Sequence, residues 1–101
     1  MRKVSPEEKL RAYDLKLKMW NDAGCRCKHC DEFLFFEQCE QAHKIPKWGW
    51  LIEKYGPEII FDEDNMDITC HDCNSKSNLN PASNPLAVEA LAASIKEKLD
   101  R

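Results

Sequence analysis

The first apolar pattern in the chain is helical. Its apolar residues recur every three or four positions: Leu10, Tyr13, Leu17 and Trp20. Ahead of them, Ser5 is a typical N-cap, Pro6 suits the first helical position, and Glu8 completes a capping box. Gly24 is typical of a helix C-terminus. The pattern therefore predicts an amphipathic helix over residues 5–23 with one apolar face.

The middle of the chain has shorter apolar stretches separated by turn residues. The apolar run Phe33 to Phe36 and the segment that follows it predict a short β-hairpin within residues 27–46. Residues 48–55 predict a small helix that Gly56 closes, and residues 59–61 form another apolar patch.

The last apolar pattern is again helical. Its apolar positions are Val88, Leu91, Ala92, Ile95 and Leu99. Asn84 and Pro85 give the N-cap and first-turn signals, so we expect a terminal helix over residues 84–100. The three patterns together favour one α+β domain, with the N-terminal helix at 5–23, a core at 25–80 and this C-terminal helix.

Length and composition narrow the class of protein. With 101 residues, of which 43% are hydrophobic, the chain fits one small domain whose thin core needs a staple. Six cysteines in so short a chain could indicate disulfides, but the first eleven residues hold no apolar run, so we expect no signal peptide and favour a reducing cytoplasm. No stretch approaches the roughly 20 apolar residues that cross a bilayer, so we expect no membrane partner.

Charge is distributed unevenly around the formal net charge of −3. Residues 1–30 carry eight Lys/Arg and four Asp/Glu, a balance of +4. Residues 31–72 carry three Lys/Arg and eleven Asp/Glu, a balance of −8. Residues 73–101 carry four Lys/Arg and three Asp/Glu, a balance of +1. This distribution suits a chain that contacts phosphate with one element and holds a cation with another, although solvated surface charge explains such clusters as well.

Two cysteine pairs carry the strongest chemical signal. They are Cys27 with Cys30, and Cys70 with Cys73, each separated by two residues. Tetrahedral zinc with bonds of about 2.3 Å needs thiolates spaced this closely. We expect a structural Zn²⁺, because four thiolates leave no open position for water. Cys25 could compete as a ligand, but Cys25 and Cys39 are more simply explained as free thiols.

Three segments around the cysteine pairs resemble a known family. They are Ala42-His43-Lys44-Ile45-Pro46, Asn65-Met66-Asp67-Ile68-Thr69-Cys70 and Cys73-Asn74-Ser75-Lys76. Their order, together with the cysteine knuckles, resembles the HNH endonucleases, whose ββα-metal core places a histidine before such a proline. The resemblance covers residues 27–78, and residues 54–60 look like an insertion seen in phage and bacterial members. It implies a zinc-stapled ββα-metal core between the flanking helices.

The resemblance also implies a mechanism of phosphodiester hydrolysis. His43 would be the general base that deprotonates a water molecule, and Asn65 would help to hold its ring. Asn74, where a helix should begin after Cys73, would be the best ligand for one divalent cation, Mg²⁺ or Mn²⁺. Asn78, one turn later, would be a weaker ligand.

One position departs from the family pattern. Members commonly have Asp or His as a metal ligand directly before the catalytic histidine, where this chain has Ala42. Glu40 or Asp67 could substitute, although both are more readily explained as surface acids.

Basic and aromatic residues near these segments are candidates for nucleic-acid contact. Lys44, Lys47 and Lys76 could contact phosphate, and solvated lysines are an equally good explanation. Trp48 and Trp50 could stack on bases, but we expect them to pack in the core.

The sequence therefore predicts a metal-dependent endonuclease that hydrolyses DNA, most simply double-stranded DNA, with little sequence preference. A homodimer or a larger phage or bacterial complex could add specificity. One alternative is a zinc-knuckle module that binds nucleic acid without cutting it. Another is a zinc-stabilised protein-interaction domain, which the acidic centre would suit.

Overall fold

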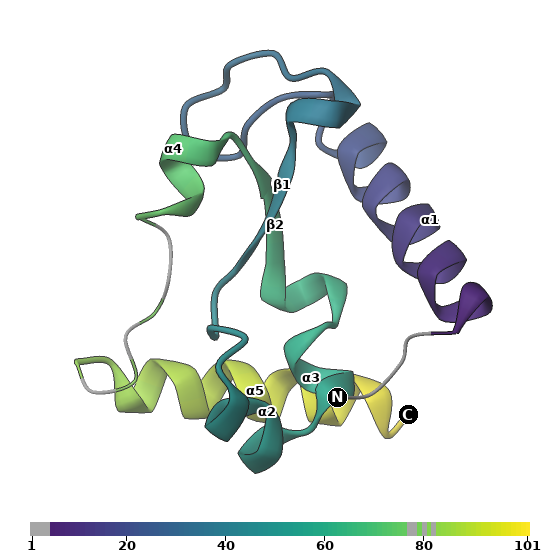
Figure 1. Cartoon of the computed structure of the whole chain (residues 1–101). Coiled ribbons are helices and arrows are strands. Elements are labelled where there is room, and N and C mark those ends of the chain that lie inside the picture. Colours follow the sequence, from purple (N-terminus) through teal and green to yellow (C-terminus); the bar gives the residue numbers. More distant parts are fainter. Residues whose placement is uncertain (1–4, 77–78, 80, 82) are drawn as a thin grey trace.

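The computed structural model describes residues 5–76, 79, 81 and 83–101 (Figure 1). Its elements are α1 (Pro6–Asp22), the 3-10 turn η1 (Phe36–Gln38), β1 (Glu40–His43), α2 (Gly49–Tyr55), α3 (Pro57–Ile60), the 3-10 turn η2 (Glu63–Asn65), β2 (Met66–Thr69), α4 (His71–Asn74) and α5 (Pro85–Leu99). Helices around a two-stranded sheet confirm the α+β class. Within these described ranges, no helix combines the length and apolar character needed to span a bilayer.

Helix α1 begins where its capping residues predict. The Ser5 Oγ accepts a hydrogen bond from the backbone N–H of Glu8 at 3.2 Å, and Gly24 follows the helix with φ of +69°. Its apolar face is only partly covered, however, because Leu10 and Tyr13 are 61% and 53% exposed. Figure 1 shows that the first half of α1 runs away from the strands, and Met19 and Trp20, which pack against a buried cluster, lie in its second half.

Strands β1 and β2 form an antiparallel pair. The paired residues are Glu40 with Thr69, Gln41 with Ile68, Ala42 with Asp67, and His43 with Met66. The hairpin expected within residues 27–46 is wrong in its first strand, because Phe33 forms an isolated bridge with Arg26, while β1 pairs with β2 across residues 44–65, which hold α2 and α3. A local pattern predicts a strand but not its partner, since pairing depends on which distant segment buries the same face.

The helices expected in the second half of the chain are present as α2 and α5. Gly56, with φ of +91°, ends α2, and Pro57 begins α3 directly after it. A left-handed φ of this size favours glycine, which explains the sharp change of direction. The apolar patch expected at residues 59–61 contributes to the core through Ile59 and Ile60, which are both buried.

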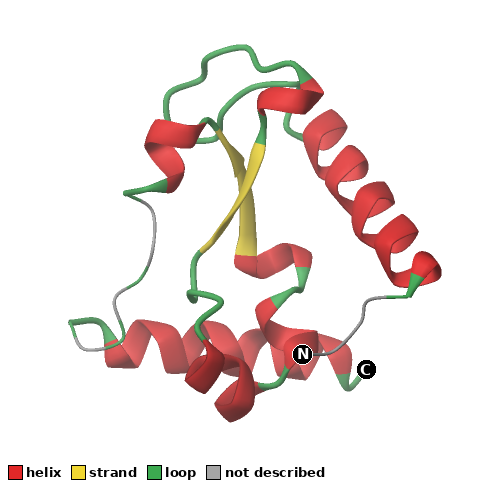
Figure 2. Ribbon diagram, viewed as in Figure 1, coloured by secondary structure: helices red, strands yellow, loops and turns green. Residues whose placement is uncertain are grey.

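Two hydrophobic clusters lie at opposite ends of the strand pair. The larger contains Ile45, Leu51, Ile59, Ile60, Val88, Ala92 and Ile95. The smaller contains Cys27, Leu34, Cys39 and Ile68, with Met19 and Trp20 of α1 packed against it. Figure 2 shows the two strands, in yellow, running from the loops beside α4 to the group formed by α2, α3 and α5. One end of the sheet is thus held by apolar packing and the other by a small cluster rich in cysteine.

Candidate functional site

The four cysteines of the two predicted pairs lie together. The Sγ atoms of Cys27, Cys30, Cys70 and Cys73 all lie within 4.8 Å of one another, and those of Cys30 and Cys70 are 3.9 Å apart. Tetrahedral zinc with bonds of about 2.3 Å separates its sulfur ligands by roughly 3.8 Å. The donor atoms and their spacing therefore fit a structural Zn²⁺.

The electrostatics of this cluster also favour a cation. Burial acts to raise the pKa of the Cys27 thiol, but hydrogen bonds from backbone N–H groups, those of Cys30 and Cys70 first, outweigh it and lower the pKa to about 6. The pKa of Cys73 is raised to about 12, first by its hydrogen bond with Cys70 and then by burial. Four sulfur atoms this close repel one another as thiolates, so a divalent cation is what allows all four to deprotonate.

Cys25 and Cys39 lie outside the four-sulfur group. The Cys39 thiol is buried and donates to the backbone carbonyl of Phe36 at 3.1 Å, and burial raises its pKa. Cys25 occupies a left-handed backbone position with φ of +62°. The structure thus places both as free thiols and gives Cys25 no part in the cluster.

His43 is half-buried at the end of β1. Burial, and then the positive charge of Lys47, lower the pKa of its imidazole below 6.5, while a hydrogen bond with the backbone of Gln41 acts in the opposite direction. The ring meets that of Phe61 edge to face, with 5.5 Å between centroids. Its Nε2 is buried and has no hydrogen-bond partner among the described residues. His43 is therefore neutral at neutral pH and can accept a proton.

Asn65 supports the backbone that follows His43. Its side chain is fully buried, and its Oδ1 accepts from the N–H of Ile45 at 2.8 Å. Its Nδ2 donates to the carbonyls of Ile45 and Ile60, at 3.1 and 2.8 Å. Any effect of Asn65 on the His43 ring therefore passes through the backbone of the turn after β1.

Asn74 meets Glu40 at the other end of β1. The Asn74 Nδ2 donates to Glu40 Oε1 at 2.6 Å, and His71 Nδ1 lies 2.9 Å from Glu40 Oε2. These bonds, that from Asn74 first, hold the pKa of the Glu40 carboxyl below its usual value. The helix expected to begin at Asn74 instead spans His71–Asn74 and ends there. Asn78, the weaker expected ligand, lies outside the described residues.

Strand β1 separates these groups. Successive side chains point to opposite faces of a strand, so Glu40 and Ala42 share one face while His43 belongs to the other. Glu40 and His43 are also about 10 Å apart along the backbone, at the rise per residue of an extended strand. The structure therefore brings Asn74 together with Glu40, and places His43 near the larger hydrophobic cluster.

Sequence reasoning misses His71. It lies between Cys70 and Cys73, and the sequence predicts that the helix begins only after Cys73. The available signal is its spacing of three residues from Asn74, which puts both side chains on one side of a helical turn. That signal becomes visible only when Cys70 is recognised as the N-cap of α4.

The three lysines predicted as candidates for phosphate contact differ in their surroundings. Lys47 and Lys76 are exposed, whereas the Nζ of Lys44 donates to a backbone carbonyl of η2 at 3.1 Å and lies 3.9 Å from Asp67 Oδ1. Lys44 is thus occupied by acceptors of the protein itself. Lys47, close enough to His43 to lower its pKa, is the best placed of the three for a phosphate near that ring.

Trp48 and Trp50 do not pack in the core as expected. They are 46% and 55% exposed. The reason is the orientation of α2, which Trp48 caps and which contacts the larger cluster through Leu51. The two indole rings are therefore accessible near Lys47.

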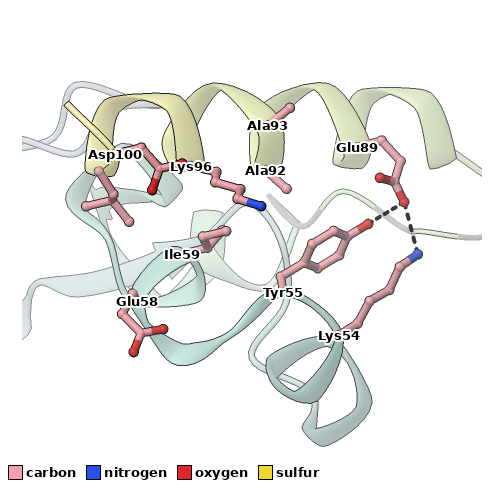
Figure 3. A pocket seen from close by; sticks show the side chains of 10 residues that line it. Lys54, Tyr55, Glu58, Ile59, Glu89, Ala92, Ala93, Lys96 and Asp100 are labelled. Carbon is pink, nitrogen blue, oxygen red and sulfur yellow. Dashed lines mark hydrogen bonds and ion pairs between the residues drawn. The ribbon is translucent and has the colours of Figure 1, made fainter.

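A cavity of ≈ 510 Å³ lies between the α2–α3 pair and α5 (Figure 3). Beside it, Tyr55 Oη and Lys54 Nζ both donate to Glu89 Oε1, at 2.7 and 2.9 Å. These bonds fasten α2 to α5. The lining contains neither the four cysteines nor His43, so we assign the cavity no part in the candidate chemistry.

Comparisons of the chain with family models, with curated proteins and with solved structures found no match. The assignment of the site therefore depends on the residues and their geometry. They establish a small α+β domain with a four-cysteine cluster suited to a metal ion.

The first prediction concerns the zinc staple. Cys70→Ser, or strong chelation of the parent protein, should unfold the chain, because a structural zinc site supplies folding free energy. We expect loss of most helical circular dichroism together with loss of bound zinc. Cys25→Ser is the matched control and should keep one zinc per chain. A chelated sample with unchanged dichroism would contradict this role.

The second prediction concerns Asn65. Asn65→Ala leaves buried backbone groups of Ile45 and Ile60 without partners, so the free energy of unfolding of the zinc-loaded protein should fall by about 3 kcal/mol. Urea denaturation measures this change. Asn21→Ala, at an exposed position of α1, is the control and should change stability by less than about 0.5 kcal/mol. Equal losses in the two variants would refute the role given to Asn65.

Proposed function

We propose that this chain is a metal-dependent endonuclease of the HNH type that hydrolyses phosphodiester bonds in double-stranded DNA, with His43 as general base. The observation that carries the proposal is the state of His43. Its pKa is lowered, its Nε2 has no partner among the described residues, and the backbone after it is fixed by Asn65. Buried polar atoms without partners are rare in folded proteins and are often found at functional sites.

In the proposed reaction, the Nε2 of His43 takes a proton from a water molecule that attacks phosphorus. The sugar oxygen then leaves with the electron pair of the broken P–O bond. Because Nε2 is covered in the free protein, the water reaches it only when bound substrate displaces neighbouring groups. A divalent cation, when bound, stabilises negative charge on the phosphoryl and leaving oxygens.

Substrate binding in this proposal depends on sequence-independent contacts. Lys47 and Lys76 are exposed and can neutralise phosphate charge. Trp48 and Trp50 are exposed and follow Lys47 closely in the sequence, so they are candidates for stacking on bases. Contacts of these kinds carry little information about base sequence, so cutting with weak sequence preference is expected.

A zinc-knuckle module that binds nucleic acid without cutting it is the alternative. Ala42 favours this function, because it is 2% exposed and has no donor atom with which to hold a cation next to His43. The accessible Trp48 and Trp50 would serve binding equally well. Catalysis is what separates the two functions.

Plasmid nicking is the third prediction. With Mg²⁺ or Mn²⁺, the parent protein should nick supercoiled DNA, and His43→Ala should reduce the rate about 100-fold or more through loss of the general base. His29→Ala replaces a histidine outside the proposed reaction and should cut like the parent.

Two other results are informative. A salt-sensitive gel shift without nicking by the parent would refute catalysis and favour the binding module. Neither a shift nor nicking would favour a zinc-stabilised protein-interaction domain.

The pH dependence of cutting is the fourth prediction. The base must be neutral, so kcat/KM should rise with pH through the lowered pKa of His43, with a midpoint below the ordinary histidine value of about 6.5. Lys47→Gln removes a positive charge that lowers this pKa, so the midpoint should move to higher pH. A parent midpoint above 6.5, or a downward shift in Lys47→Gln, would contradict the assignment of the base.

A further inference from the structure

Three polar side chains converge where β1 meets α4. Glu40 begins β1, while His71 and Asn74 are the first and last residues of α4. The carboxylate of Glu40 receives His71 Nδ1 on one oxygen and Asn74 Nδ2 on the other, at 2.9 and 2.6 Å. Because Cys70 and Cys73 belong to the sulfur cluster, a bound zinc would fix α4 and with it the positions of these side chains.

These distances suit ligands of one hard cation. Neighbouring ligands of an octahedral ion with bonds of about 2.1 Å lie roughly 3 Å apart. The Glu40 and His71 atoms already have this separation. Turning the Asn74 amide by half a rotation exchanges its nitrogen for its carbonyl oxygen, which is a ligand for such ions.

Thr69 provides a separate observation at the same place. It is the β2 partner of Glu40, so both side chains lie on one face of the strand pair. Thr69 is 0% exposed, and its Oγ1 has no hydrogen-bond partner in the described part of the chain. A buried hydroxyl without a partner is costly, and a water molecule on a neighbouring cation would satisfy it.

Asp67, the other acid considered for this role, is already compensated. Its carboxylate lies 3.9 Å from Lys44 Nζ and 4.0 Å from His29 Nε2. Neither contact involves α4. Asp67 faces a lysine ammonium as well as an imidazole, whereas Glu40 meets two potential metal ligands of α4.

We propose that Glu40, His71 and Asn74 bind a divalent cation at the junction of β1 and α4. Its role in cutting DNA rests on the proposed nuclease function. Three protein ligands leave positions for water and for a phosphate oxygen, as is usual for ions that act on phosphate. A site with one imidazole should hold Mn²⁺ more tightly than Mg²⁺.

The fifth prediction tests this site by the binding of Mn²⁺ alone to the zinc-loaded protein, followed by electron paramagnetic resonance. The parent should bind one Mn²⁺, and Glu40→Gln should weaken binding at least tenfold. Asp67→Asn removes a carboxylate from the same face of the strand pair and should leave the affinity within twofold. His71→Ala, at an exposed position, should weaken binding as Glu40→Gln does and serves if the latter does not fold.

Several results would overturn the proposal. They are no Mn²⁺ binding by the folded parent, binding that Glu40→Gln leaves unchanged, and equal losses in Glu40→Gln and Asp67→Asn. Zinc content is measured in every variant, so that loss of the staple is recognised.

Nicking by the same proteins separates this site from the nuclease function. Binding that depends on Glu40, without nicking by the parent, would retain the cation site and refute the nuclease. Nicking that persists in Glu40→Gln would retain the nuclease and refute a role of this cation in cutting.

Discussion

The sulfur cluster is the constraint on which the rest of the structure depends. It joins Cys30 to Cys70 across 40 positions, in a domain whose apolar residues divide into two small clusters. The cluster beside the sulfurs has few large apolar side chains, and α1 reaches it only through its second half. There, Trp20 Nε1 donates to the carbonyl of Leu34 at 2.9 Å. So small a core does not easily offset the entropy of closing a long loop, and a metal ion bound to the four thiolates would contribute the difference.

The strand pair connects this staple to the larger apolar cluster and sets where polar groups can lie. Its cysteine end carries Glu40 against α4, and its other end carries His43 beside Asn65 and Phe61. Where the strand pairing ends, the Asn65 side chain supplies hydrogen-bond partners to the backbone. Its amide joins the turn after β1 to the end of α3. A fully buried amide with three backbone partners makes that turn rigid.

The sequence was sufficient for features that depend on local spacing. The C-x-x-C pairs predict the sulfur cluster because ligand distance is set by a two-residue turn, and Ser5, Gly56 and Pro85 mark helix ends through their own backbone preferences. Features that depend on distant packing could not be read in this way. The partner of β1 is an example, since a strand pattern carries no information about which segment covers it.

Exposure could not be read from residue type either. Trp50 and Leu10 are apolar residues at helical positions, and both are exposed because their helices contact the core through other residues. His71 could not be identified from the sequence for a different reason. It belongs to no recognised motif, and its contact with Glu40 depends on the position of α4 beside β1.

The departure at Ala42 can be understood from the period of a strand. A ligand moved from position 42 to position 40 stays on the same face, but it moves about 7 Å toward the cysteine end. A cation held by Glu40 in the proposed site would lie beside α4, where His71 Nδ1 is 2.9 Å from the Glu40 carboxylate. Under the proposed nuclease function, a metal ligand at position 40 in place of position 42 would therefore take its partner from α4, next to the cysteine cluster. Glu40 and His43 also lie on opposite faces of β1 and about 10 Å apart along the backbone, so a bound substrate would have to pass the edge of the strand pair for both groups to act on one bond.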